Sequence, residues 1–255
     1  MIVSQLEKEE VLTKEPELAK FILPYIGSVE FINHKRRYCF WLVNASPSEI
    51  RKSPELLKRV NAVKEMREKS TAKPTREKAL TPHLFFFISQ PNSDYLMIPR
   101  VSSERRKYIP IGFMSPNIIA SDSCSIVPNA TMYHFGVLTS NVHMAWMRTV
   151  AGRLKSDYRY SGSVVYNTFP WPSPTEAQKA KIEKTAQGIL AARKLYPDSS
   201  LADLYDEATM PIELRNAHRA NDRAVMEAYG FWGRLNSEPE CVAALMELYR
   251  KLVEK

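Results

Sequence analysis

Short apolar runs separated by turn-forming residues dominate the first two thirds of the chain. Each run is rich in aromatic or β-branched residues and is too short to be an ordinary amphipathic helix. Turn signals such as Asn44-Ala45-Ser46-Pro47 separate the runs. The pattern predicts strands at residues 38–43, 84–89, 95–99, 108–114, 118–120, 124–127 and 133–137. This many short strands indicates a β-rich domain.

Helical periodicity appears in a few places and dominates the last third. After Ser53-Pro54, the apolar residues Leu56, Val60 and Val63 recur on one helical face. Apolar stripes with start or stop signals predict further helices at residues 139–151, 175–195, 211–229 and 237–252. The fold class expected is α+β: a β-rich domain followed by a small α-helical C-terminal domain.

Proline-rich breaks suggest the domain boundaries. The segment FPWPSP at residues 169–174 suits neither a helix nor a central strand. We therefore expect one domain over residues 38–172 and a helical domain over 173–255. Residues 1–37, which contain Glu15-Pro16 and Leu23-Pro24, read as a connector. The run from Lys69 to Lys78 has no apolar periodicity and reads as a basic loop.

The positive charge is concentrated in the middle of the chain. Of 255 residues with a net charge of +8, residues 35–162 carry 21 Lys/Arg against 9 Asp/Glu. Residues 1–34 carry 3 against 6, and residues 163–255 carry 12 against 13. A basic module between near-neutral ones suits phosphate binding by counterion release. The alternative is a charged surface that only keeps the protein in solution.

Several site classes find no support in the sequence. Cys39, Cys124 and Cys241 lie far apart and form no C-x-x-C pair, so neither a zinc site nor a disulfide framework is indicated. The histidines are not grouped in the sequence with other residues that could bind a metal ion. No apolar run approaches the roughly 20 residues that span a bilayer. We expect no metal, no membrane association and a reducing cytoplasm as the compartment.

Two segments carry candidate binding chemistry. Residues 148–172 intersperse cations with tyrosines and small polar residues, which suits a polyanion with flat bases: cations hold phosphates, and Arg, Asn and Ser can read base edges. Alternatively, the tyrosines pack a core and Asp157 pairs with a neighbouring arginine. In the second segment, Ser102–Lys107, arginine could bind guanine and Glu104 could accept from cytosine, or the segment could be an exposed turn. An extended backbone would point Arg105 and Arg106 to opposite sides.

These segments also carry a family resemblance. YRYSGSVVYNTFPWP, EFINHKRRYCFWL, VSSERRKYIPIGFM and LADLYDEATMPIELRNAHRANDRAVMEAYG resemble, in their order, parts of one family. It is the MmeI-like (type IIL/IIG) DNA adenine methyltransferases, which are bacterial restriction–modification enzymes. The matching parts are the target recognition domain and the helical C-terminal domain. The resemblance implies that residues 1–37 connect to an upstream methyltransferase domain that this chain lacks.

The resemblance also implies a function: sequence-specific recognition of double-stranded DNA for a site-specific N6-adenine methyltransferase. S-adenosylmethionine would bind in the missing domain, so no cofactor is expected in this chain. The implied partners are double-stranded DNA and a methyltransferase domain or subunit. The DNA-binding candidates carried over by segment are Ser102, Ser103, Glu104, Arg105, Arg106, Lys107, Arg148, Arg153, Lys155, Ser156, Arg159, Tyr160, Ser161 and Asn167.

Catalytic motifs of the family are not found. The chain contains no Pro-Pro pair and hence no (N/D/S)-P-P-(Y/F) tetrapeptide, which in the family holds a flipped adenine. The most similar tetrapeptide is SPNI at residues 115–118. The sequence also contains no G-x-G pattern of a cofactor-binding loop. We expect no catalytic residue here. Two alternatives stay open: a subunit of a split DNA methyltransferase or nuclease, and a non-catalytic protein-interaction module with a basic surface.

Overall fold

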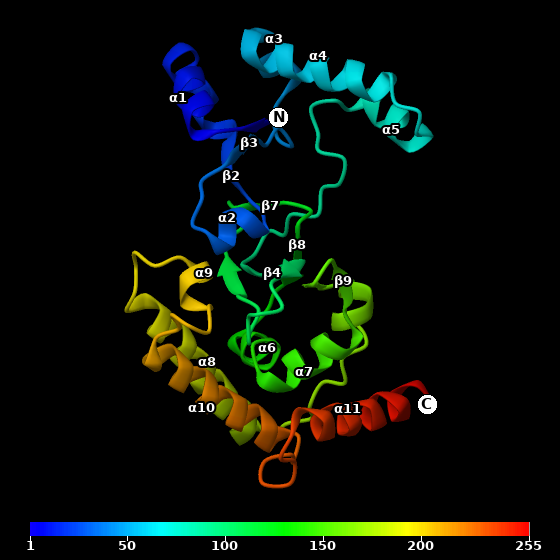
Figure 1. Ribbon diagram of the computed structural model, residues 1–255. Helices are drawn as coiled ribbons and strands as arrows, with labels where there is room; N and C mark the ends of the chain where they lie inside the picture. The colour runs from blue at the N-terminus through cyan, green and yellow to red at the C-terminus, as the bar shows by residue number, and fades with distance from the viewer. Residues whose placement is uncertain (255) are drawn as a thin grey trace. The chain divides into compact units, whose positions relative to one another are not determined.

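The chain passes back and forth between two structural units, so neither is a continuous stretch of sequence. A computed structural model describes residues 1–254 (Figure 1). Unit 1 contains residues 1–26, 35–92 and 116–121, and unit 2 contains residues 27–34, 93–115 and 122–255.

Unit 1 combines a four-stranded sheet with helices. The strands lie in the order β1-β3-β2-β7, with β2/β7 parallel and the other pairs antiparallel. The strands are β1 (Ile2–Val3), β2 (Ile22–Ile26), β3 (Tyr38–Phe40) and β7 (Ile119–Ala120). The helices are α1 (Gln5–Lys14), η1 (Pro16–Phe21), α3 (Pro47–Lys52), α4 (Pro54–Glu68), α5 (Lys73–Glu77) and η2 (Lys78–Leu80).

Local signals explain where the helices of unit 1 begin. Ser4, Ser46 and Ser53 each cap a helix by accepting a hydrogen bond from an amide of the first turn. The apolar faces of these helices pack against the sheet in a core that includes Val11, Phe40 and Leu56. Residues 1–37 are therefore built into folded structure: α1, η1 and β2 lie in unit 1, and α2 (Ser28–Ile32) lies in unit 2. The domain boundaries at residues 37 and 172 stay predictions.

Unit 2 contains two three-stranded antiparallel sheets. One has the order β6-β4-β8 and the other β5-β10-β9. The strands are β4 (Tyr95–Pro99), β5 (Val101–Ser102), β6 (Gly112–Met114), β8 (Cys124–Pro128), β9 (Gly152–Leu154) and β10 (Asp157–Arg159). Every residue of β4 is buried, so this strand forms part of the unit's core.

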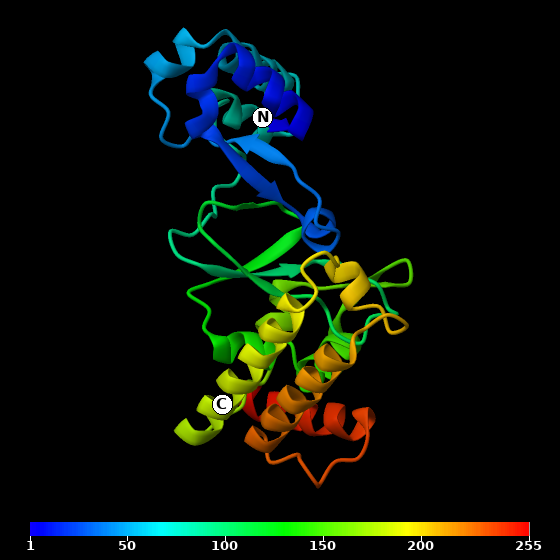
Figure 2. The same cartoon turned by 90° about the vertical axis from the view of Figure 1, so that its left-hand side faces the viewer.

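The helices of unit 2 pack against one another as well as against the sheets. Besides α2 they are α6 (Met132–Leu138), α7 (Asn141–Val150), η3 (Gly162–Tyr166), α8 (Glu176–Lys194), α9 (Leu201–Leu204), α10 (Ile212–Ala228) and α11 (Glu238–Val253). Helices α8 and α10 run side by side in both views (Figures 1 and 2), and α6 packs on α8. The glycine at position 136 allows α6 to approach α8 and α10 closely. A Cβ at this position would lie 2.6 Å from Ile182 Cγ2 and 3.1 Å from Asn221 Oδ1.

The expected α+β fold class is confirmed, but three predicted elements are wrong. Residues 133–137 were expected to form a strand and lie instead in α6, because a short buried apolar run does not distinguish helix from strand. Residues 84–89 form no strand, and Phe87 is 80% exposed. The run Lys69–Lys78 is not only a loop, because Pro74 stands in the first turn of α5.

Candidate nucleic-acid interface

The sheet β5-β10-β9, which we call the basic sheet, brings the two candidate segments together. Strand β5 ends at Ser102, and the hairpin β9–β10 comes from residues 152–159. Tyr158 pairs with Ser102 on one side and with Arg153 on the other. Segments about 50 residues apart in the sequence thus form a single structural element.

The register of the basic sheet divides its side chains between two faces, because directly opposite residues share a face. Ser102, Tyr158 and Arg153 lie on one face, and the Arg153 guanidinium stacks 3.8 Å from the centre of the Tyr158 ring. Arg159 lies on the other face, between Val101 and Gly152. It is exposed, and the absence of a side chain at Gly152 leaves space beside it.

The hairpin end of the basic sheet is open to solvent. All three residues of β9 are exposed, and so are Lys155 and Ser156 at the turn. Lys155 has a φ of 56°, a conformation that costs a non-glycine residue energy and often marks a functional loop. The Arg153 guanidinium donates a 2.7 Å hydrogen bond to the Ser156 carbonyl, which braces the turn.

The second candidate segment forms a tight turn directly after β5. The Arg106 amide donates to the Ser103 carbonyl at 3.1 Å, and Glu104 Oε2 lies 3.5 Å from Arg153 Nη1. Arg105 and Lys107 are exposed. Arg106 is half-buried, and burial lowers the pKa of its guanidinium while Asp157 and Asp206 oppose that shift.

Two of the candidates, Ser102 and Tyr160, have buried side chains in this structure. Ser102 is 2% exposed and Tyr160 is 1% exposed, so neither side chain offers surface to a nucleic acid. The Tyr160 hydroxyl lies 3.1 Å from His143 Nε2, and burial lowers the pKa of His143 to about 3. A neutral His143 and Tyr160 therefore form a buried hydrogen-bonded pair directly after β10.

Arg148 makes contacts within the protein, and its contact with DNA stays a prediction. Its Nε and Nη2 each lie 2.7 Å from an oxygen of Glu238, and its Nη1 donates to the Lys107 carbonyl at 3.1 Å. This bidentate pair joins α7 to the first turn of α11. These contacts of Arg148 connect elements of unit 2.

Beyond the basic sheet, the chain forms a turn of π-helix, η3. The Asn167 amide donates to the Gly162 carbonyl at 2.9 Å, and Trp146 Nε1 donates to the Val165 carbonyl at 3.1 Å. Such turns are rare and often accompany functional sites. Ser161 and Ser163 exchange a 2.9 Å hydrogen bond at the start of η3, and the side chain of Asn167 is exposed.

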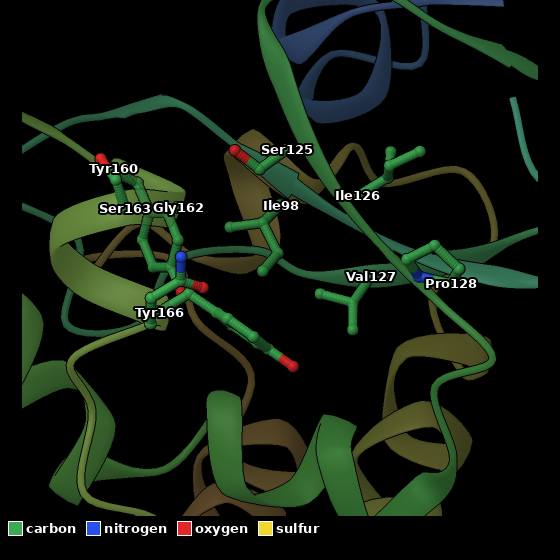
Figure 3. Close-up of a pocket in the computed structure, with 10 residues that line it drawn as sticks. Ile98, Ser125, Ile126, Val127, Pro128, Tyr160, Gly162, Ser163 and Tyr166 are labelled. Atoms are coloured by element: carbon green, nitrogen blue, oxygen red, sulfur yellow. The ribbon is translucent and has the colours of Figure 1, made fainter. Parts of the chain in front are cut away.

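A pocket of about 520 Å³ lies between η3 and strand β8 (Figure 3). Its lining consists of Ile98, Ser125, Ile126, Val127, Pro128, Tyr160, Gly162, Ser163, Tyr166 and Asn167. The residues of β8 were absent from the sequence-based candidates, because their apolar pattern indicated only a strand. Only the three-dimensional structure places them in the same pocket lining as Asn167.

Other site types gain no support from residues 1–254. No group of three or more His, Cys, Asp or Glu side chains in this range could hold a metal ion. No helix within it is long and apolar enough to cross a membrane.

Comparison with known proteins agrees with this geometry. The target recognition domain of MmeI matches residues 1–173, and the C-terminal domain of MmeI matches residues 174–255. The chain belongs to the MmeI family.

Two relatives show how much of the longer family members this chain represents. It is 40% identical over 249 residues to DNA methyltransferase A of Bacillus subtilis (strain 168), a match that covers 98% of this chain and 28% of that protein. It also matches a solved structure of the type IIL restriction–modification enzyme MmeI in complex with DNA. That match has a TM-score of 0.97 and 49% identity, and covers 100% of this chain and 34% of that one. The chain thus spans about a third or less of either relative.

Proposed function

We propose that this chain is the sequence-specific double-stranded DNA recognition module of a site-specific N6-adenine DNA methyltransferase of a restriction–modification system. The observation that carries the proposal is the basic sheet, whose exposed hairpin carries Arg153 on one face, Arg159 on the other and Lys155 at the turn. A two-stranded β-ribbon fits the major groove of B-DNA, where base pairs can be told apart. The MmeI–DNA complex to which the chain is similar supports this reading.

The exposed candidates divide by chemistry. Arg105, Lys107 and Lys155 are cations on turns, suited to contacting phosphates and setting the register of the module on the duplex. Arg159 and Asn167 have side chains that can read base edges, guanine and adenine respectively. Ser103, Ser156 and Ser161 can donate or accept hydrogen bonds at the same surface, and the Glu104 carboxylate can accept them. Ser102, Tyr160 and Arg148 hold this surface in place.

Methyl transfer would belong to a catalytic portion outside the residues described above. S-adenosylmethionine would bind to that portion, and the basic sheet would place it on its target sequence. The implied partners are therefore double-stranded DNA and a methyltransferase domain or subunit, and the site of action is the bacterial cytoplasm. A subunit of a split enzyme would use the same surface in the same way.

Duplex binding across a salt series tests the proposal. A variant with Arg153, Lys155 and Arg159 all changed to alanine should bind a DNA duplex more weakly than the unmodified chain. Its plot of log affinity against log salt should also be shallower, by about 0.9 for each phosphate that the variant no longer neutralises. Lys184→Ala is the control, because Lys184 is an exposed cation on α8 and not part of the basic sheet. Equal affinity and slope for the triple variant and the control would refute the proposal.

A further inference from the structure

Residues 84–90 form an extended strap in unit 1 whose sequence and structure disagree. Leu84–Ser89 reads LFFFIS, a run typical of a buried strand. In the structure it pairs with no strand, and among residues 1–254 no backbone hydrogen bond is formed by the amides of Phe85–Ser89. Disagreement between local sequence preference and fold is expected where a partner completes the structure.

The strap is nevertheless held firmly at both ends. At its start, the buried guanidinium of Arg67 donates to the carbonyls of Lys78, Thr81 and Leu84 at 2.9, 3.0 and 2.8 Å. At its end, the Gln90 side-chain amide donates to the carbonyls of Pro116 and Ile118 at 2.9 and 2.8 Å. An extended segment fixed in this way loses little conformational entropy when a partner binds it.

The side chains at the start of the strap face the core of unit 1, whereas Phe87, Ile88 and Ser89 are all exposed. The Phe85 ring packs at 5.7 Å from Tyr25 and 5.5 Å from Trp41, measured between ring centres. Phe87 is 80% exposed, although its ring meets Phe86 edge-on at 4.7 Å. Ile88 is 47% exposed, and Leu80 on the adjoining η2 is 87% exposed. Preorganised exposed aromatic and aliphatic groups of this kind anchor protein interfaces.

The charges around the strap select among possible partners. Lys73, Arg76 and Lys78 on α5 and η2 are exposed, with Glu77 as the one acidic residue of that segment. A second copy of this chain would bring the same cations against them, which like-charge repulsion disfavours. Duplex DNA would suit the cations but would leave Phe87, Ile88 and Leu80 without an apolar partner. An apolar protein face with an acidic rim satisfies both features.

We propose that the strap is the docking strand for the catalytic portion of a DNA methyltransferase, with Phe87 and Ile88 as anchors on an apolar, acid-rimmed face. This inference rests on the proposed function, because it names the partner that positions the chemistry. The lengths of the relatives agree with it, since the chain matches 28% of one and 34% of the other. The remaining parts of such proteins must contact a recognition module somewhere in order to be positioned by it.

The test uses a full-length protein: DNA methyltransferase A of Bacillus subtilis with its matched segment exchanged for this chain. A photo-cross-linking p-benzoylphenylalanine replaces Phe87, and peptides joined to it are identified by mass spectrometry. The same group at Leu195, which is 63% exposed on the other unit, is the control. We expect position 87, and not position 195, to cross-link to peptides of the catalytic portion. Cross-links only to DNA or to a second copy, or none at all, would overturn the proposal.

A double variant in the same exchanged protein gives a second readout. Phe87→Ser with Ile88→Ser should lower methyl transfer by at least about tenfold, because anchors of this type dominate interfaces. Duplex affinity and melting temperature should stay within error, since both side chains are largely exposed. Leu195→Ser should change none of these. Unchanged methyl transfer in the double variant would contradict docking of the strap. The proposed function fails separately: it would be contradicted if the isolated chain, with its strap unmodified, did not bind duplex DNA.

Discussion

The Tyr108 hydroxyl donates a 2.6 Å hydrogen bond to Asp222, which lies 114 positions later in the sequence. The other oxygen of the same carboxylate accepts from the amide of Asn141, the first residue of α7, at 2.7 Å. Helix α10 is thereby joined to the segment that follows the candidate turn 103–106. Asp222 is 7% exposed, so this junction is buried.

The junction should make stability depend on pH. Burial is the main cause that raises the pKa of Asp222 to about 6, while the hydrogen bonds from Tyr108 and Asn141 oppose the rise. A raised folded-state pKa means that Asp222 stabilises most below its unfolded pKa, near 4, and that this contribution is lost as the pH rises through about 6. Asp222→Asn removes the titration. The unfolding free energy of the variant minus that of the wild type should therefore increase between pH 4 and pH 7, by up to about 3 kcal/mol.

Urea denaturation at several pH values measures this difference. Because asparagine retains one acceptor and adds a donor, the variant need not match the wild type at any single pH. The informative quantity is the slope of the difference with pH, and a constant difference would show that Asp222 does not titrate in this range.

Arg159→Ala should lower affinity for the preferred DNA sequence more than for random duplexes. A base-edge arginine contributes about 1–3 kcal/mol of discrimination, and Arg159 is exposed on β10. Selection from a randomised duplex pool, followed by fluorescence anisotropy, measures the effect. Lys155→Ala is the matched variant. As a phosphate contact it should weaken all sequences about equally. Identical sequence preferences in wild type and Arg159→Ala would exclude base reading by this residue.

Arg148→Ala should destabilise the protein without acting directly on DNA. Its guanidinium makes a bidentate pair with Glu238 and also contacts the Lys107 carbonyl, so the loss is expected to cost about 1–2 kcal/mol. Chemical denaturation measures it. Arg148→Lys keeps the charge but cannot form the two parallel bonds, so it should recover only part of the stability. If Arg148→Ala were fully stable but bound DNA poorly, the assignment of Arg148 to internal contacts would fail.

Two glycines in helices should respond in opposite ways to alanine. Gly136→Ala brings a Cβ within 2.6 Å of Ile182 Cγ2, and overpacking of this kind costs about 1–3 kcal/mol. Gly188→Ala on α8 meets nothing within 4 Å and should stabilise the helix by about 0.5–1 kcal/mol. Thermal unfolding of the two variants tests the pair. A neutral Gly136→Ala would mean that α6 and α8 pack less closely than described.

Elements with local start and stop signals were predictable from the sequence. Ser53 caps α4 as expected, and α8 and α11 begin at Glu176 and Glu238, each one residue after the predicted start. Residues 124–127 and 95–99 lie in the strands expected for them. In each case the signal and the structure it specifies lie within a few residues of one another.

What could not be predicted depends on contacts between distant residues. The pairing of Tyr158 with Ser102 and the burial of Tyr160 against His143 arise from tertiary packing, so the sequence indicated the two basic segments but not their shared sheet. In the sequence, Arg148 is indistinguishable from the other cations of its segment. Its pairing with Glu238, 90 residues later, is seen only in the structure. The strand prediction for residues 84–89 was wrong because apolar character alone does not show whether a segment pairs with other strands of the fold.

The close approach of Gly136 to Ile182 and Asn221 has a consequence for building hybrid enzymes with new target sequences. A recombination breakpoint near residue 173 looks natural, because the prolines of FPWPSP lie there. Such a cut would combine α6 of one parent with α8 and α10 of another, so that a bulkier residue on either side would push them apart. Exchanging residues 1–255 as a single cassette keeps these co-adapted surfaces together and is the safer unit of engineering.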